Sequence, residues 1–253
     1  MRAIITLFLL VSNSYYLFAQ DNYEIQVYGS ETMKKGATMV ELHSNFTFDG
    51  APSTEKGVKP TNHIDHETIE ITHGFNDWFE VGFYLFNAIG DKNRTDYVGS
   101  HIRPRVMLPA KFKFPVGLSL SAEVGYQKPR FCDDDWTLEI RPIIDKKINK
   151  LYLCFNPVLD KSLHGANTGL GYTFSPNAKV SYDVNKTFSL GFEYYGSMGT
   201  WNHFSASNQQ QHNLFIALDV DFDPKWELNV GYGWGFNKQT DNAILKCIIG
   251  RRF

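Results

Sequence analysis

Segments of about ten residues, in which apolar side chains alternate with polar or small ones, recur along most of this sequence. A period of two is typical of β-strands that have one apolar face. Each segment is long enough to cross a bilayer when tilted. Twelve such segments are found, at 38–48, 66–75, 78–87, 98–108, 116–127, 135–148, 151–162, 172–183, 187–197, 211–222, 226–236 and 243–253.

The connections between these segments alternate between two lengths. One set is short and rich in Asn, Asp and Pro, residues that favour tight turns: 76–77, 109–115, 149–150, 184–186 and 223–225. The other set is longer and polar: 49–65, 88–97, 128–134, 163–171, 198–210 and 237–242. Outer-membrane barrels have short periplasmic turns and long outward loops. An even strand number also returns the C-terminus to the side where the first strand begins.

The direction of the apolar face follows from the strand number. In 78–87, for example, Phe79, Val81 and Phe83 share one face and Glu80 and Gly82 the other. A closed barrel of twelve strands has a lumen too wide to fill easily with apolar side chains, whereas eight strands enclose a filled core. We therefore predict an all-β fold, a transmembrane antiparallel up-and-down β-barrel of about 12 strands with its apolar face toward lipid. A soluble two-layer protein is the alternative.

The first twenty residues have the pattern of an export signal. Arg2 precedes an apolar run at 3–11, and the small residue Ala19 is followed by Gln20. The run is too short for a transmembrane helix, which needs about 20 apolar residues. We predict a cleaved signal peptide at 1–20, an N-terminal periplasmic extension or plug at 21–37, and the barrel at 38–253. These features predict the outer membrane of a Gram-negative bacterium as the location.

Composition excludes some partners. The formal net charge of −2 and the pI near 6.4 argue against nucleic-acid binding, which needs a basic surface. Three cysteines with no metal-binding or CxxC spacing predict no disulfide framework. Four strand prolines, Pro104, Pro142, Pro157 and Pro176, should each cost a ladder hydrogen bond or mark a bulge.

Charged residues on the predicted inward face are candidates for lining a solute path. Opposite charges on neighbouring strands could instead form ion pairs that brace the wall, as with Arg103 and Arg105 between strands carrying Glu80 and Glu123. The balance of signs predicts no ion preference. The lumen-lining candidates are Glu41, His43, Glu70, Glu80, Arg103, Arg105, Glu123, Glu139, Arg141, Lys179, Glu193, Asp219 and Lys246.

Other motifs support no activity. His63, Asp65, His66 and Glu67 suggest a metal site, but alternation sends His66 and Glu67 to opposite faces, so we interpret them as a solvated loop end. The acidic run at 133–135 lacks the spacing of a calcium loop. No Ser–His pair with the geometry of a lipase is visible. We predict no catalytic residues, no metal and no cofactor.

Several strand sequences resemble a family of uncharacterised outer-membrane β-barrels of Gram-negative bacteria, over nearly the whole chain beyond the signal. The chain is more loosely similar to barrels grouped as phenol meta-pathway or hydrocarbon transporters, which implies transport by analogy. The resemblance rests on VELHSNF (from Val40), HETIEITHGFNDWFEVGFY (from His66), HIRPRV (from His101), LSLSAEVGYQ (from Leu118), TLEIRPIID (from Thr137), FSPNAKVSYD (from Phe174), GFEYYGS (from Gly191) and KCIIGRRF (from Lys246).

The leading functional hypothesis is therefore a passive channel or transporter for a small solute. The first alternative is a closed structural or adhesive barrel that presents its extracellular loops to a partner, and the second is an outer-membrane lipid-modifying enzyme. The expected partners are outer-membrane lipid, the barrel-insertion machinery and a small-molecule solute. The terminal Phe253 resembles the assembly signal of such barrels, and Lys246 should lie near Glu41 if the first and last strands close the wall.

Overall fold

The computed structural model describes residues 22–50, 57–90, 94–237 and 240–253. These residues form fourteen strands and one short 3-10 helix, η2 (Ala110–Phe112), and none of their helices is long and apolar enough to cross a membrane. The strands are β1 (Thr38–Asp49), β2 (Ile64–Asn76), β3 (Phe79–Ile89), β4 (Thr95–Met107), β5 (Gly117–Gln127), β6 (Trp136–Ile148), β7 (Leu151–His164), β8 (Thr173–Asp183), β9 (Phe188–Ser197), β10 (Gly199–Thr200), β11 (His203–Phe204), β12 (Gln211–Val220), β13 (Trp226–Gly235) and β14 (Ala243–Arg252).

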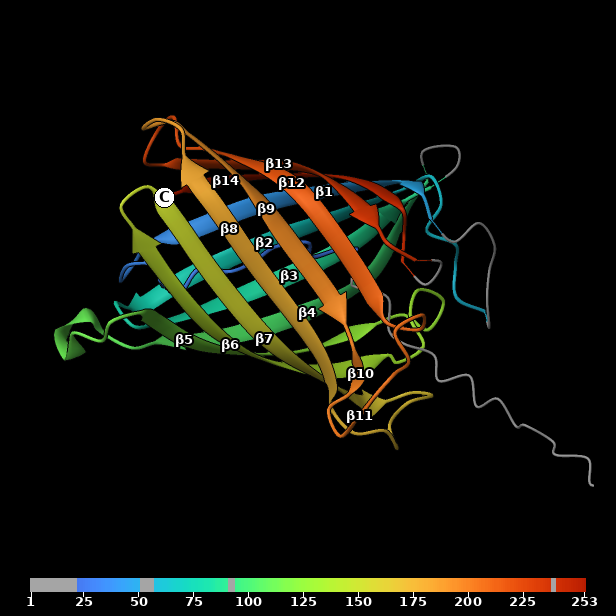
Figure 1. The fold of residues 1–253 in the computed structure, drawn as a ribbon. Coiled ribbons are helices and arrows are strands. Elements are labelled where there is room, and N and C mark those ends of the chain that lie inside the picture. The colour runs from blue at the N-terminus through green and yellow to red at the C-terminus, as the bar shows by residue number, and fades with distance from the viewer. Residues whose placement is uncertain (1–21, 51–56, 91–93, 238–239) are drawn as a thin grey trace, which may run out of the picture.

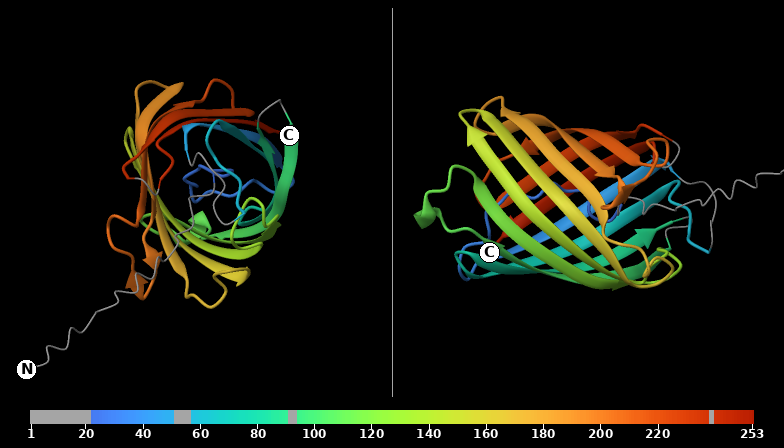
Figure 2. Two further views of the ribbon diagram at one scale, coloured as in Figure 1. Left: turned by 90° about the vertical axis from the view of Figure 1, so that its right-hand side faces the viewer. Right: turned by 60° about the horizontal axis from the view of Figure 1, so that its bottom comes forward.

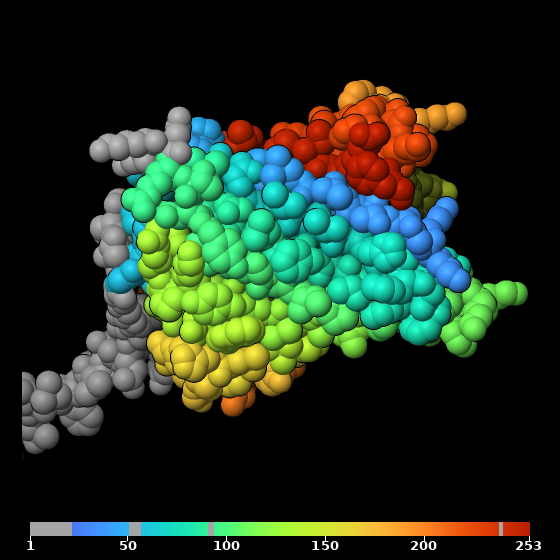
Figure 3. All heavy atoms as spheres, turned by 180° about the vertical axis from the view of Figure 1, so that it is seen from behind, coloured from blue at the N-terminus to red at the C-terminus, as the bar shows by residue number. Residues whose placement is uncertain are grey.

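Twelve of these strands form a closed antiparallel wall (Figure 1). Each pairs with its neighbours in chain order, and β9 pairs with both β8 and β12. The wall closes where β1 pairs with β14 over ten residue pairs, including Leu42 with Ile249 and Phe46 with Leu245. In Figure 3 the blue β1 accordingly lies beside the red β14. The predicted up-and-down barrel of twelve strands is confirmed, and the two-layer alternative is wrong.

The remaining strands, β10 and β11, have two residues each and form a short hairpin within the connection between β9 and β12. This hairpin extends the sheet at the edge of β8, where Thr200 pairs with Thr173. Strands this short carry no recognisable alternation, so the sequence predicts only a loop at 198–210.

The two faces of the wall have opposite chemistry. Outward side chains are apolar and exposed, for example Leu42, Phe83, Ile102 and Leu120, each between 40% and 47% exposed. Inward side chains are mostly polar or charged and buried, such as Thr68, Glu70 and Arg103. A soluble barrel would show the reverse arrangement, so the apolar surface is the one that faces lipid.

Three of the four strand prolines lie beside a gap in the pairing on one side of their strand, whereas Pro176 pairs with Pro157 in the unbroken ladder between β7 and β8. Between β6 and β7 the pairing is interrupted from Ile140–Leu159 to Ile144–Phe155 without a change of register, and the gap contains Pro142 and Pro157. Between β4 and β5 it is interrupted in the same way from Ile102–Val124 to Arg105–Ser121, beside Pro104. Because proline has no amide hydrogen, a barrel that has no edge strand accommodates it at the cost of local pairing.

Residues 22–37, hereafter the lumen segment, run inside the barrel without forming a strand. The end-on view in Figure 2 shows this dark blue trace within the ring of strands. Its Ile25, Val27 and Tyr28 are buried against inward apolar side chains of the wall, and the wall residues of this cluster are Ile143, Cys154, Tyr195, Phe215 and Ile244. The lumen therefore has a small apolar core that neither the wall nor the segment could form alone.

Candidate functional site: an occupied lumen

The lumen segment reaches from one end of the barrel to the other. At the end with the long connections, Asn22 Nδ2 donates to Asp241 Oδ2 at 2.6 Å. At the end with the short turns, the backbone N–H of Lys35 donates to Asp77 Oδ1 at 3.1 Å. The chain then turns at Gly36 and enters β1. Any solute that crosses the barrel has to pass this segment.

Side chains of the wall satisfy the segment's backbone. Thr68 Oγ1 donates to the carbonyl of Tyr23 at 2.7 Å, and Lys246 Nζ donates to that of Ile25 at 3.1 Å. Asn156 makes a reciprocal pair with Tyr28, accepting from its N–H at 2.9 Å and donating to its carbonyl at 3.0 Å. A buried backbone must find partners somewhere, and here side chains replace the usual strand ladder.

The first charge network lies toward the short-turn end. Arg103 Nη2 is 2.7 Å from Glu70 Oε1, and Arg105 Nη2 is 2.6 Å from Glu80 Oε1. Arg105 also donates to the carbonyls of Gly29 and Glu31, and the guanidinium of Arg103 lies 4.2 Å from the ring centroid of Tyr28. This network holds the lumen segment as well as bracing the wall.

Glu123, expected opposite these arginines, instead has His101 as its partner, with Nδ1 and Oε1 2.6 Å apart. In the register of the sheet, Tyr84 of β3 pairs with His101 and His101 with Gly125 of β5. Glu123 lies two residues along β5 from Ser121, the partner of Arg105, and the ladder between β4 and β5 is interrupted at Arg103 and Pro104.

The second charge network is centred on Glu193 of β9. Lys246 forms a close ion pair with it, and Lys179 Nζ lies 3.1 Å from Glu193 Oε1 and 2.7 Å from Asp219 Oδ1. The sequence predicts Lys246 beside Glu41. The first and last strands do close the wall, but their register pairs Glu41 with Gly250 and Lys246 with Asn45, so Glu41 lies too far along the strand.

All thirteen sequence-predicted lumen residues lie on the inward face, and the most exposed side chain among those in ion pairs, that of Asp219, is 25% exposed. Eight of them line two cavities on either side of the lumen segment, and the other five, His43, Lys179, Glu193, Asp219 and Lys246, line neither cavity. The cavity at the short-turn end has a volume of about 1090 Å³ and includes Glu41, Glu70, Glu80, Arg103 and Arg105. The cavity at the long-loop end has a volume of about 270 Å³ and includes Glu123, Glu139 and Arg141.

Sequence reasoning missed several residues that matter here. Asp145 accepts two hydrogen bonds from Ser30, and Asn156 and Asp160 also point inward. Alternation along β6 and β7 could have identified these three. Nothing in the sequence could have identified Glu24 and Tyr28, because their role depends on the segment's position in the lumen.

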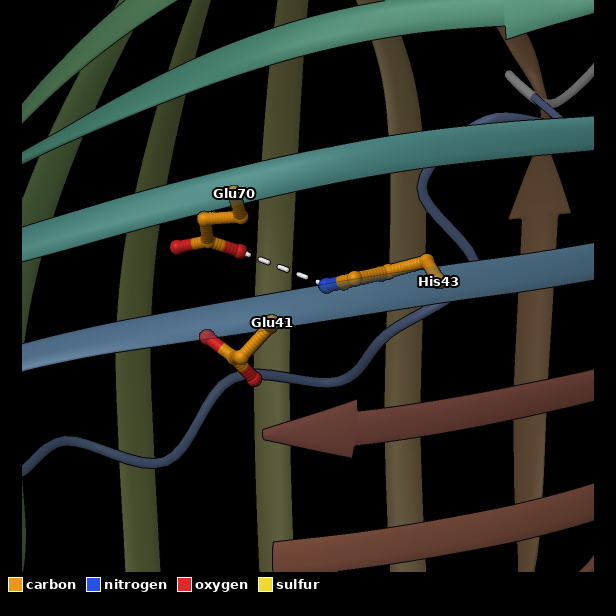
Figure 4. A group of neighbouring side chains, drawn as sticks. All are labelled: Glu41, His43 and Glu70. Atoms are coloured by element: carbon orange, nitrogen blue, oxygen red, sulfur yellow. Dashed lines mark ion pairs between the residues drawn. The ribbon is translucent and has the colours of Figure 1, made fainter. Parts of the chain in front are cut away.

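One group of side chains has the spacing of a metal site. Ligand atoms of Glu41, His43 and Glu70 all lie within 4.8 Å of one another, and Figure 4 shows the three side chains converging from β1 and β2. His43 Nε2 is 3.5 Å from Glu70 Oε2. The other oxygen of Glu70 already accepts from Arg103 and from Thr72. Because the guanidinium supplies a positive charge at this position, we assign no metal to the group.

The cluster around His66, interpreted above as a solvated loop end, is different in the structure. His66 lies on β2, is buried in the lumen, and packs edge-on against Tyr23 with ring centroids 4.9 Å apart. Strand β2 begins at Ile64, two residues earlier than predicted, which brings His66 fully into the wall.

Comparison with known proteins identifies the family. Residues 68–245 match the family described as "Putative MetA-pathway of phenol degradation", over well more than half of the chain. The chain belongs to this family. The match covers β3 to β13 entirely, with most of β2 and the start of β14. A search of curated proteins gave no match.

Several solved outer-membrane barrels are similar in structure. The KdgM porin has a TM-score of 0.57 at 10% identity, covering 85% of this chain and 99% of its own. An outer-membrane channel from Pseudomonas putida F1 has a TM-score of 0.57 at 15% identity, covering 91% and 100%. The NanC porin has a TM-score of 0.59 at 8% identity, covering 83% and 97%. At these identities the likeness concerns the fold.

The closed wall, the exposed apolar belt and this fold together place the protein in the outer membrane of a Gram-negative bacterium. The aromatic side chains Trp78, Trp136 and Trp234 are 40–48% exposed near strand ends, as expected of residues at the membrane interfaces.

Proposed function

We propose that this protein is a passive channel for small solutes and that the lumen segment is its plug. The observation that carries the proposal is the polar lumen, divided into two cavities by a segment that wall side chains hold. A segment held in this way can leave without unzipping the wall, whereas a strand of the barrel cannot.

The neighbours support transport rather than catalysis. Those with the same fold are named as porins and an outer-membrane channel, and one is described as "KdgM porin in complex with disordered oligogalacturonate". Oligogalacturonate is the ligand of that protein. For this chain, the solute class has to be argued from its own cavities.

Removing the plug tests the proposal. We expect the full-length protein in planar bilayers to show small or rare conductance steps, and a variant lacking residues 22–36 to show larger and long-lived ones. The apparent mass on unheated gels, which reports a folded barrel, is the control for assembly. A folded deletion variant without conductance would contradict the channel and favour the closed structural barrel.

A reversible lock tests the plug without removing it. A Cβ built on Gly117 would lie 3.1 Å from Cβ of Ser30 in the lumen segment, slightly closer than the usual disulfide spacing of about 3.5–4.5 Å, and 2.1 Å from Oδ1 of Asp145, so this carboxylate has to turn aside in the variant. We expect the oxidised S30C/G117C variant to conduct less than the wild type and to recover on reduction. The single variant S30C, treated identically, is the control. Equal conductance in both redox states would contradict plug movement.

A further inference from the structure

Three carboxylates stand side by side across the wall of the long-loop cavity. In the register of the sheet, Glu123 of β5 pairs with Glu139 of β6, and Glu139 pairs with Asp160 of β7. All three line the cavity. Like charges directly opposite one another destabilise a sheet, so this row needs positive charge nearby.

The protein supplies only part of that charge. Arg141 forms a two-pronged pair with Glu139, through Nε at 2.6 Å and Nη2 at 2.7 Å. Asp160 accepts a hydrogen bond from Ser175 at 2.8 Å, which carries no charge. Glu123 accepts from His101 through Oε1, while its Oε2 has no hydrogen-bond partner among the described residues.

The lumen segment adds a fourth carboxylate. The Glu24 side chain is 6% exposed, and its Oε1 lies 3.7 Å from Arg141 Nη1 without a hydrogen bond. Six acidic and three basic side chains line the cavity within the described residues. The other two basic groups are engaged at its rim, Lys59 with Asp96 at 2.7 Å and Lys161 with the carbonyls of Thr168 and Leu170.

The rest of the lining is suited to an organic ligand. Tyr23 and Phe131 contribute aromatic rings, and Ile64, Ala88 and Val158 contribute apolar surface. Aromatic faces attract cations, and carboxylates accept N–H hydrogen bonds from ammonium groups. An apolar pocket with a few converging polar groups is the usual form of a small-molecule site.

We propose that this acidic chamber, formed by Glu24, Glu123, Glu139 and Asp160, binds a small organic cation such as an amine. The binding site stands on the geometry alone, and its use for uptake rests on the proposed channel. Summed over the lumen, the charges predicted no ion preference. In the structure the charges are distributed unevenly between the two cavities. Among the described residues, the short-turn cavity has six acidic and seven basic side chains, whereas the long-loop cavity has six acidic and three basic.

The binding test uses two probes of similar shape and opposite charge. Isothermal titration calorimetry on the purified full-length protein in detergent would compare phenethylamine with 3-phenylpropanoate. We expect saturable binding of the amine and none of the carboxylate. Equal binding of both probes, or binding of neither, would overturn the proposal. Binding of Ca²⁺ with no binding of the amine would do so as well, because the site would then be an inorganic cation site.

Substitution locates the site. In Glu123→Gln the amide oxygen can keep the contact with His101 while the charge is lost, so we expect amine binding to weaken about tenfold or more. The matched control is Glu227→Gln, in the other cavity, where Arg252 is the partner. An unchanged affinity in Glu123→Gln would place the amine elsewhere and overturn the assignment.

A flux test separates this proposal from the channel. The variant that lacks residues 22–36 would be tested in two ways. The release of each probe would be measured from loaded liposomes, and the reversal potential would be measured in planar bilayers with a salt gradient. The deletion removes Glu24 but leaves the row on the wall, so we expect preference for cations and for the amine. Binding without any flux would contradict the channel and leave the site standing. Flux with preference for anions would overturn the chamber as a selectivity element.

Discussion

At the scale of single residues, the lumen is a set of buried charges that stabilise the fold only when paired. Glu193, with a side chain 2% exposed, lies between Lys246 and Lys179 and also accepts from the hydroxyl of Tyr195 at 2.9 Å. Breaking a buried pair by removing one partner is far more costly than the pair itself is stabilising, because the remaining charge stays buried. Glu193 is thus the residue on which this half of the lumen depends most.

We predict that Glu193→Gln lowers the free energy of unfolding by about 3–5 kcal/mol, since the two ammonium groups lose their shared carboxylate. Denaturant titration of the protein in lipid vesicles measures this effect. The comparison variant is Glu227→Gln, whose ion pair with Arg252 is about one-third exposed and for which a change of about 0–1 kcal/mol is expected. A similar small change for both variants would refute the pairing argument.

For single residues, the face to which a side chain points could be predicted from the sequence, but its ion-pair partner could not. Period-two alternation identified which side of each strand Glu193 and Lys246 face, because a strand places successive side chains on opposite faces. It could not identify their pairing, because β9 and β14 are separated in the wall by β12 and β13. Long side chains meet across the lumen there, which no neighbour rule describes.

At the level of whole elements, the lumen segment differs from the strands around it because it forms no strand of its own. Its backbone meets that of the wall at Gly74 of β2, whose N–H donates to the carbonyl of Ala37 at 3.0 Å and whose carbonyl accepts from the N–H of Gly36 at 2.7 Å. A Cβ at residue 74 would collide with the carbonyl oxygens of Met33 and Lys34. Glycine is required here because two backbones meet.

We predict that Gly74→Ala loosens the short-turn end of the segment, because the added methyl group displaces residues 33–36. Overpacking of this kind costs about 1–3 kcal/mol, so trypsin should cleave after Lys34 or Lys35 about tenfold faster or more. Digestion of the folded protein in detergent, followed by mass spectrometry, measures the rate. Gly171→Ala, where the nearest atom to an added Cβ is 3.7 Å away, should leave it unchanged. Equal rates in the two variants would argue against tight contact at residue 74.

The wall could be predicted from sequence at this scale, and the segment could not. Each of the twelve strands carries its own periodic signal. The lumen segment has no period because its hydrogen bonds go to side chains such as Asn156, more than a hundred residues away. Its apolar residues pack on Phe215 and Ile244, inward exceptions to the polar lining that single-strand patterns do not distinguish.

At the scale of the whole molecule, the barrel depends on the closure of β1 with β14. Thr38 and Phe253 exchange backbone hydrogen bonds at 3.2 and 2.8 Å at the end of this seam. Phe253 itself, by contrast, is 67% exposed. We therefore expect the terminal aromatic ring to add little to the stability of the finished barrel, and we propose that it acts during insertion.

We predict that Phe253→Ala slows assembly by the insertion machinery while leaving the stability of the folded barrel within about 0.5 kcal/mol of the wild type, as for other surface substitutions. The first quantity is the rate of appearance of folded protein in cells or in proteoliposomes with the purified machinery. The second is denaturant unfolding of the purified barrel. Phe222→Ala, also exposed but outside the last strand, is the control. Assembly at the wild-type rate would rule out the terminal signal.

The lumen segment also makes the two mouths of the barrel thermodynamically linked. One stretch of backbone carries Glu24 in the acidic chamber and, at its other end, Lys35 beside Asp77. If an amine binds more tightly when the segment is seated, linkage requires that the amine hold the segment in place by the same free energy. If the amine competes with Glu24 for room, it drives the segment out. The sign of this coupling, measured as the effect of phenethylamine on cleavage after Lys35, therefore decides whether such a solute closes its own route or opens it.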